Sequence, residues 1–240
     1  MASSQPSGRD ERVRDLFESK AASWSAKYAP GGDMTGRLER FVSTFDRHLK
    51  PSARVLEIGC GTGNLALMLA SKGITITATD ISKKMLSHAS AHDNGAAVEW
   101  VLLQTHWTTL PFDDGSFDAV IASSVLEYVD DIYLVLREIA RVVAVDGLLV
   151  CTVPDPEHPV RRIEALVAPL ARSSVGQFLS RLSPRIANYF TYLCVSRHRH
   201  TASWWHDIAH SVRLRPLEQQ GTECGRPPLR LLVYRRSNAV

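Results

Sequence analysis

The sequence predicts an α/β fold, because short apolar segments alternate with amphipathic segments along most of the chain. The apolar run from Val55 to Ile58 contains a single acid, Glu57, and leads directly into a glycine-rich turn. This turn has glycines at alternate positions, namely Gly59, Gly61 and Gly63. Glycine permits positive φ and lets the backbone approach a ligand closely, so a strand that ends here predicts a nucleotide-like ligand.

A second strand is expected from Ile74 to Asp80, and it also ends in an acid. A carboxylate at this place suits the two hydroxyls of a ribose. The alternative for Asp80 is a helix N-cap before Ser82. The apolar segment that begins at Asn64 predicts a helix whose N-terminus points back at the same ligand.

The remaining elements follow from periodicity and turn residues. Helices are expected over 11–19, 35–49, 134–142 and 203–212, and strands over 148–153, 213–222 and 229–235. At 240 residues the chain can bury a substantial core without dividing into independent domains. We therefore expect residues 1–19 to form a flexible N-terminus and the start of a lid helix, and residues 20–240 to form one domain.

A helical insertion is predicted at about 156–200. Pro154, Pro156 and Pro159 end the preceding strand. Three amphipathic helices follow, with the apolar positions Ile163, Leu166, Val167 and Leu170; Val175, Phe178, Leu179 and Leu182; and Ile186, Tyr189, Phe190 and Leu193. An insertion at the carboxyl edge of the sheet predicts a roof over the substrate pocket. The alternatives are a contact between two copies of the chain and a membrane-surface contact.

Charge is divided unevenly along the chain. Through Asp155 there are 15 Lys and Arg against 20 Asp and Glu, whereas from Pro156 onward there are 13 arginines, no lysine and 5 acids. Arginine holds carboxylate or phosphate in a forked geometry, which permits an anionic acceptor or a membrane surface, and a solvated basic face is the alternative. Nucleic-acid binding is not expected, because no reading motif accompanies these arginines.

Composition further restricts the class of protein. No apolar run is long enough to span a bilayer and the first ten residues are polar, so we expect a cytoplasmic location. The cysteines lack CxxC or metal-ligand spacing, and no metal site is expected. They are Cys60, Cys151, Cys194 and Cys224.

The spacing of the glycines separates two nucleotide chemistries. A dinucleotide fingerprint requires glycines at the first, third and sixth positions, but the sixth position from Gly59 is Asn64. An NAD-dependent oxidoreductase is therefore disfavoured.

The run from Leu56 to Gly63 instead resembles the first motif of the class I S-adenosylmethionine-dependent methyltransferases. Later segments resemble further motifs of the family in the same order, namely 110–121, 123–129, 134–142 and 146–153. The resemblance implies a Rossmann-like, seven-stranded and mostly parallel sheet in the order 3-2-1-4-5-7-6, with helices on both faces and an antiparallel seventh strand. It also implies S-adenosylmethionine as the cofactor.

The resemblance implies a set of cofactor contacts. The glycine turn, with Cys60 inside it, would lie against the methionine part and ribose, and Glu57 would approach the methionine ammonium. Asp80 would accept from the ribose hydroxyls. The expected positions around the adenine and sulfonium are Ile81 and Met85 for the former and Ser123 and Leu126 for the latter. Tyr28 is the expected lid residue, although Trp24 and Tyr28 could instead hold a helix on the core.

One segment departs from the family pattern. Many relatives have an aspartate that reads the adenine amino group before the Leu-Pro-Phe sequence, and here Thr105, His106 and Trp107 lie in that region. His106 takes the place of the acid. A neutral imidazole can accept the same hydrogen bond, and Trp107 can stack on the ring.

The expected reaction is methyl transfer to a hydroxyl of a small-molecule biosynthetic intermediate, with quinone and natural-product methyltransferases as the nearest resemblance. His158 or His200 is the expected base for that hydroxyl. Two alternatives stay open besides the oxidoreductase. One is a relative that binds the cofactor and catalyses a different reaction, and the other is a membrane-associated methyltransferase with a lipid-linked acceptor. A homodimer is compatible with either.

Overall fold

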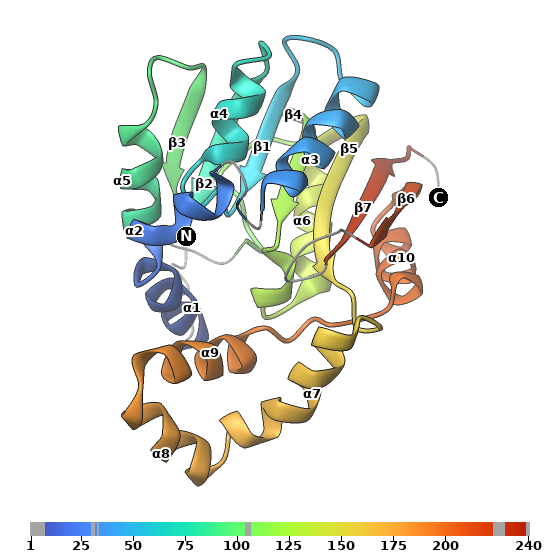
Figure 1. The fold of residues 1–240 in the computed structure, drawn as a ribbon. Coiled ribbons are helices and arrows are strands. Elements are labelled where there is room, and N and C mark those ends of the chain that lie inside the picture. Colours follow the sequence, from blue (N-terminus) through green and yellow to red (C-terminus); the bar gives the residue numbers. More distant parts are fainter. Residues whose placement is uncertain (1–7, 30–31, 33, 104–106, 223–228, 239–240) are drawn as a thin grey trace.

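A seven-stranded sheet forms the centre of the computed structural model, which describes residues 8–29, 32, 34–103, 107–222 and 229–238 (Figure 1). The strand order is β3-β2-β1-β4-β5-β7-β6, as predicted. The strands are β1 (Arg54–Ile58), β2 (Thr75–Asp80), β3 (Val98–Leu102), β4 (Phe117–Ser123), β5 (Val143–Pro154), β6 (Leu214–Thr222) and β7 (Leu229–Arg236). Strand β7 pairs antiparallel with β5 and β6, and the other neighbours are parallel. The parallel arrangement brings the ends of β1, β2 and β4 to one edge.

Helices cover both faces of the sheet. They are α3 (Thr35–His48), α4 (Asn64–Ala70) and α5 (Lys83–Ala91) on one face, and α6 (Ile132–Val142) and α10 (Ala202–Ser211) on the other. Side chains alternate between the two faces along each strand. Val55 therefore packs in the core under α3, α4 and α5, and Leu56 packs in the core under α6 and α10. Both are fully buried. Two apolar cores therefore hold the sheet edge in place.

The predicted insertion forms three helices that extend away from the sheet (Figure 1). They are α7 (Pro159–Ala171), α8 (Ser174–Leu182) and α9 (Pro184–Val195). Pro159 and Pro184 occupy the first turn of their helices, where a missing N–H costs nothing. The Ser173 hydroxyl caps α8 by accepting from the Gly176 N–H at 3.1 Å. A small apolar core around Phe190 and Leu193 joins the three helices.

The N-terminal segment lies beside the insertion. It comprises α1 (Gly8–Glu18), α2 (Ala21–Trp24) and the 3-10 turn η1 (Ser25–Tyr28). Helix α1 begins earlier than the expected residue 11, because Arg9 is buried and tied down: its guanidinium donates to the carbonyls of Val129 at 3.0 Å and Val195 at 2.7 Å and pairs with Asp130. These contacts hold the segment from residue 8 against the domain.

Candidate cofactor and acceptor site

The glycine turn has the backbone that the sequence predicts. Gly59, Gly61 and Gly63 have φ of 69°, 57° and 75°. A Cβ on Gly59 would overlap a methyl group of Val125, and one on Gly63 would lie 2.5 Å from the Trp100 ring. The turn therefore needs glycine both for its left-handed conformation and for its close neighbours.

Asp80 fastens this turn to the end of β2. One carboxylate oxygen accepts from the Gly61 N–H at 2.8 Å, and the other accepts from the Ser82 N–H at 2.8 Å. Ser82 itself is the N-cap of α5, since its hydroxyl accepts from the Met85 N–H. The carboxyl is buried, and burial raises the pKa of Asp80 to about 6. The alternative of a helix cap thus applies to Ser82, while Asp80 faces the turn.

Glu57 is a buried acid at the end of β1, with 2% of its surface exposed. It accepts from the Ala66 N–H, but its Oε2 atom has no hydrogen-bond partner. Burial, and secondarily the nearby Asp80, raises the pKa of Glu57 to about 8. A buried acceptor without a partner is costly, so this oxygen is suited to receive a donor from a ligand.

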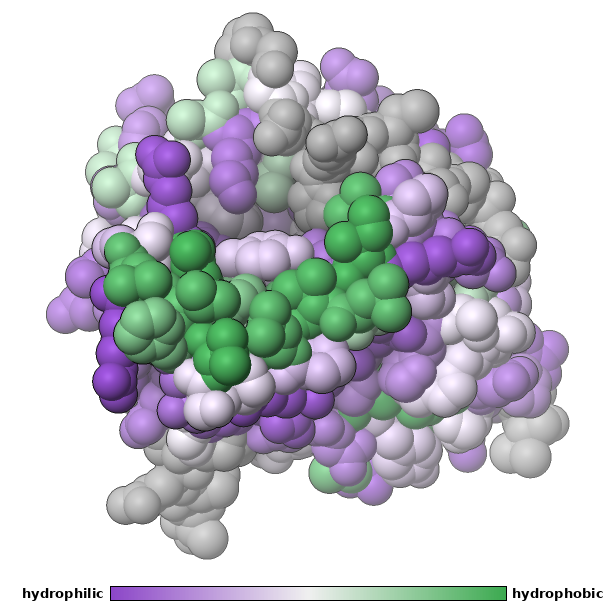
Figure 2. Space-filling model, turned by 60° about the horizontal axis from the view of Figure 1, so that its bottom comes forward, coloured by the Kyte–Doolittle hydropathy of each residue, from purple (hydrophilic) through white to green (hydrophobic). Residues whose placement is uncertain are grey.

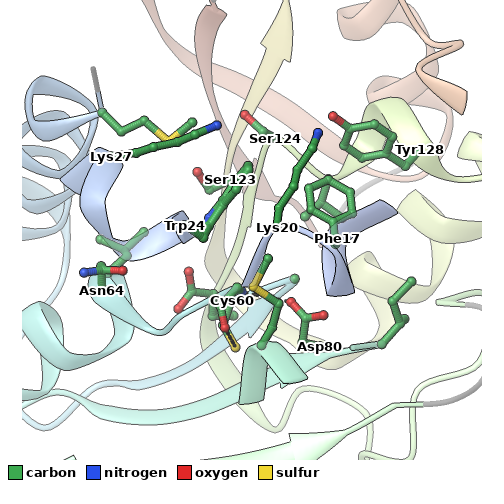
Figure 3. Close-up of a pocket in the computed structure, with 18 of the residues that line it drawn as sticks. Phe17, Lys20, Trp24, Lys27, Cys60, Asn64, Asp80, Ser123, Ser124 and Tyr128 are labelled. Carbon is green, nitrogen blue, oxygen red and sulfur yellow. Dashed lines mark hydrogen bonds between the residues drawn. The ribbon is translucent and has the colours of Figure 1, made fainter. Parts of the chain in front are cut away.

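A cavity opens above the turn and is lined by β1, β2, β4 and the N-terminal helices (Figure 3). It encloses about 1120 Å³, including space open to solvent. In Figure 3 Cys60 and Asp80 lie on one side, Ser124 and Tyr128 lie on the other, and Trp24 lies between them. We call the side with Cys60 and Asp80 the turn side of the cavity, and the side with Ser124 and Tyr128 the side opposite the turn.

The N-terminal segment supplies the cover. The Trp24 indole nitrogen lies 3.2 Å from the position a Cβ would take on Gly61. The ring of Phe17 contacts Trp24 edge-on at 5.6 Å and Tyr128 at 5.2 Å between centroids. Lys27 places its ammonium 4.1 Å from the Trp24 ring centroid. These contacts link the cover to both sides of the cavity.

Polar groups gather on the side opposite the turn. Ser124 has a φ of 55°, and its hydroxyl accepts from the buried Arg37 guanidinium at 3.1 Å. Glu127, 2% exposed, accepts from the Ser196 hydroxyl. Burial raises the pKa of Glu127. Lys20 also lines the cavity, and burial lowers its pKa to about 8. This side therefore offers a carboxyl group with a raised pKa and an amine with a lowered pKa.

Most of the expected cofactor residues meet at this cavity. Those that line it are Tyr28, Glu57, Gly59, Cys60, Gly61, Asp80, Ile81, Met85, Trp107 and Ser123. Gly63 and Leu126 do not line it: Gly63 caps α4, and Leu126 is buried in the core beside the cavity. Thr105 and His106 lie outside the described residues. These placements leave the role of each residue a prediction.

The two expected catalytic histidines lie elsewhere, and neither is among the described residues that line the cavity. The Nδ1 of His158 accepts from the Val160 N–H at 3.3 Å, which makes this residue the N-cap of α7. His200 stacks on Trp204 with 3.6 Å between ring centroids. Both side chains thus have structural contacts, and their catalytic role stays a prediction without a site around it.

The insertion contributes less to the cavity than expected. Of its described residues only Tyr192, on α9, lines the cavity. Lining residues that were not expected from the sequence are Val13, Phe17, Lys20, Lys27, Met34, Arg37, Leu38, Asn64, Leu65, Ser124, Val125 and Tyr192. The signal in the sequence that could have indicated these residues is the pair of aromatic residues Phe17 and Trp24, which lie on α1 and α2 and line the same cavity. No group of three or more His, Cys, Asp or Glu in the described part of the chain is arranged to hold a metal ion.

Comparison with known proteins agrees with this geometry. Residues 56–151 match a family described as a methyltransferase domain. The chain is 33% identical over 140 residues to a malonyl-[acyl-carrier protein] O-methyltransferase of Geobacter sulfurreducens, covering 57% of this chain and 51% of the relative. It is 36% identical over 139 residues to a demethylmenaquinone methyltransferase of Corynebacterium efficiens, covering 58% and 54%. The chain thus spans about half the length of these curated relatives.

The whole fold is shared with a solved structure. A magnesium protoporphyrin IX methyltransferase from Synechocystis PCC 6803, with bound S-adenosylhomocysteine, superposes with a TM-score of 0.70 and 20% identity over 95% of this chain and all of the other. Sheet order and glycine turn together define a class I methyltransferase fold. Residues 56–151 are a methyltransferase domain of the S-adenosylmethionine-dependent class, which confirms the resemblance seen in the sequence and, with it, the cofactor of the domain.

Proposed function

We propose that this protein transfers a methyl group from S-adenosylmethionine to an oxygen of a small-molecule acceptor in the cavity. The observation that carries the proposal is the buried Glu57 carboxylate, whose Oε2 atom lacks a partner beside the glycine turn. The methionine part of the cofactor carries an ammonium group, which can satisfy that oxygen. The ammonium favours the ionised form of the Glu57 carboxyl, and the resulting pair gains a charge-assisted hydrogen bond.

The other contacts on the turn side fit the same ligand. Each Asp80 oxygen accepts a backbone N–H and, as a carboxylate oxygen, can accept a further donor, so the residue can receive the ribose hydroxyls. Ile81 and Met85 provide an apolar surface next to Asp80 for the adenine. We assign Trp107, which also lines the cavity, to the adenine side.

The acceptor belongs on the side opposite the turn. When bound, the cofactor supplies a methyl group activated by a positively charged sulfur. The chain must then align the acceptor oxygen with that methyl group and, for a hydroxyl, take up the proton. Our candidate for taking up that proton is Glu127, a buried acid among the residues that line the cavity, and Lys20 with its lowered pKa is the second.

One relative supports oxygen as the acceptor atom, because it is named a malonyl-[acyl-carrier protein] O-methyltransferase. A second relative, named a demethylmenaquinone methyltransferase, supports a biosynthetic intermediate as the acceptor. We propose that a small acceptor group enters the cavity, because its space of about 1120 Å³, which includes space open to solvent, must hold both the cofactor and this group.

The test is transfer of an isotopically labelled methyl group to a panel of phenols, reduced quinones and carboxylic acids. We expect label in at least one oxygen-containing acceptor, and loss of transfer in Glu57→Gln. A matched control is Glu157→Gln, which changes an acid at an exposed site. Cofactor binding without transfer to any acceptor in the panel would contradict the proposed methyl transfer. It would favour the alternative that the protein binds the cofactor but catalyses a different reaction.

A further inference from the structure

The three insertion helices expose a row of large apolar side chains. Leu166 and Leu182 are 81% and 65% exposed, values far from those of core residues. The members of this row, called here the cap face, are Ile163, Leu166, Leu170, Val175, Phe178, Leu182 and Tyr189. Figure 2 shows a green band of apolar side chains on this face of the molecule, with pale and purple side chains along its lower border. Isolated exposed leucines are ordinary, but a contiguous apolar band marks an interaction surface.

The cap face is what remains after the insertion has built its own core. On α7, Val167 turns inward while Leu166 and Leu170 point out. On α8, Leu179 turns inward while Phe178 and Leu182 point out. Each helix therefore has apolar residues on two sides. One side is used within the insertion, and the other has no partner among the described residues.

The charges around the cap face are almost all positive. Residues 158–200 contain seven arginines and a single acid, Glu164. Glu164 is buried and pairs with Arg161 at 2.9 Å and Arg199 at 3.0 Å, so it does not offset the surface charge. The arginines exposed to solvent are Arg162, Arg172, Arg181, Arg185 and Arg197. An apolar band bordered by cations matches the two layers of an anionic membrane surface.

A second copy of the chain fits this surface less well. In a two-fold dimer the same face meets itself, so the arginines of one copy would lie near those of the other. Helices α7, α8 and α9 offer no exposed acid to pair with them, because their one acid, Glu164, is buried, and Glu157 just before α7 pairs with Arg230. Like charges brought together in this way oppose association.

We propose that the cap face docks the protein on a bilayer that contains anionic phospholipids. The apolar residues of α7 and α8 enter the boundary between head groups and acyl chains, and the arginines contact the phosphate groups. No helix in the described ranges has the length and apolar character to cross a membrane. The helices lie along the surface of the bilayer. Helix α9 connects this surface to the cavity, since it carries Tyr189 on the cap face and Tyr192 on the cavity wall.

Binding of the full chain to vesicles tests the proposal directly. Vesicles of phosphatidylcholine alone are compared with vesicles that also contain phosphatidylglycerol, by flotation at low and high salt. We expect binding to the anionic vesicles, weaker binding to the neutral ones, and a loss of binding as salt screens the arginines. This readout does not depend on methyl transfer, so its failure and the failure of the proposed function are distinguishable.

Two sets of variants locate the surface. The variant Leu166→Gln, Phe178→Gln, Leu182→Gln removes apolar groups that are at least 60% exposed, so its thermal unfolding should match that of the unchanged protein. We expect its vesicle affinity to fall by about tenfold or more. The matched control, Met68→Gln, Tyr133→Gln, Val145→Gln, changes three exposed apolar residues outside the insertion and should keep full binding.

The arginines are tested separately by Arg172→Gln, Arg181→Gln, Arg185→Gln. Each arginine near an anionic surface contributes roughly fivefold to the affinity, so this variant should bind far more weakly. The matched control is Arg137→Gln, Arg215→Gln, Arg235→Gln, which changes three arginines exposed on other elements and should keep full binding. Absence of vesicle binding by the unchanged protein would overturn the proposal. So would binding by both cap-face variants that equals that of the unchanged protein. A concentration-dependent dimer that the apolar variant abolishes, without vesicle binding, would assign the surface to a second copy.

Discussion

The carboxylate of Asp80 accepts a hydrogen bond from the backbone N–H of Gly61 at 2.8 Å. This bond joins the end of β2 to the glycine turn after β1, so two strand ends form one rigid edge of the cavity. The same residue lines the cavity, where we propose that it receives the ribose. We therefore expect cofactor binding and the shape of the turn to be coupled through this side chain.

Asp80→Asn should weaken cofactor binding by at least about tenfold, because an amide that replaces the carboxylate loses a charge-assisted bond of roughly 1.5–3 kcal/mol. Calorimetric titration with S-adenosylmethionine measures the effect. Asp15→Asn, a change at an exposed position of α1, is the control and should bind normally. Equal affinities for the two variants would exclude Asp80 from the cofactor site.

Gly59→Ala tests the close approach at the turn. The left-handed backbone and the overlap with Val125 should together lower the free energy of unfolding by about 2–4 kcal/mol. Gly73→Ala is the matched control: Gly73 has a φ of 83°, but no described atom lies within 4 Å of its Cβ position, so only about 1 kcal/mol should be lost. Chemical denaturation compares them. A similar loss at both positions would show that the Val125 contact is unimportant.

Glu57 should make the ligand-free protein less stable as the pH rises. Its pKa is 4.5 as a free group and about 8 in the folded protein, so the folded state holds a proton that the unfolded chain has released. Stability from this proton is complete below pH 4.5 and is lost as the pH rises through 8. The loss is at most about 1.4 kcal/mol per pH unit.

The measurement is thermal unfolding between about pH 7 and pH 8, where Asp80, with its pKa of about 6, is almost fully ionised. Glu57→Gln should flatten the decline, because a glutamine does not titrate. A decline that is unchanged in this variant would show that another group causes it.

Substitutions of the two histidines and of Glu127 should have different effects on turnover. His158→Ala should cost about 1 kcal/mol of stability through the lost cap on α7, and neither it nor His200→Ala should slow turnover at saturating acceptor. Glu127→Gln should lower that turnover by about a hundredfold, the usual size of a lost proton acceptor. Steady-state kinetics on a hydroxyl acceptor decide between them. A large loss in either histidine variant, with Glu127→Gln active, would return the base to the histidines.

The sheet and the turn side of the site could be predicted because their signals are local. A strand, its terminal acid and the glycines that follow are contiguous, so Glu57, Gly59 and Asp80 could be placed from spacing alone. The resemblance then supplied the strand order, including the antiparallel β7.

The cover could not be predicted with the same detail, because its contacts join distant parts of the chain. Phe17 reaches Tyr128 across more than a hundred residues, and nothing in the local sequence of either residue indicates that contact. The insertion shows the converse: its apolar stripes were visible, but periodicity could not tell which stripe faces inward. Val167 and Leu179 became core, while Leu166 and Phe178 remained on the surface.

The central claim is that the cavity binds S-adenosylmethionine. The most direct measurement is thermal unfolding of the protein with S-adenosylmethionine, S-adenosylhomocysteine, NAD and NADP in parallel. At 100 times its dissociation constant a ligand adds about 2.7 kcal/mol of stability. We predict stabilisation by the first two compounds, absent with the dinucleotides and reduced in Glu57→Gln. Stabilisation by NAD or NADP alone would contradict the assignment.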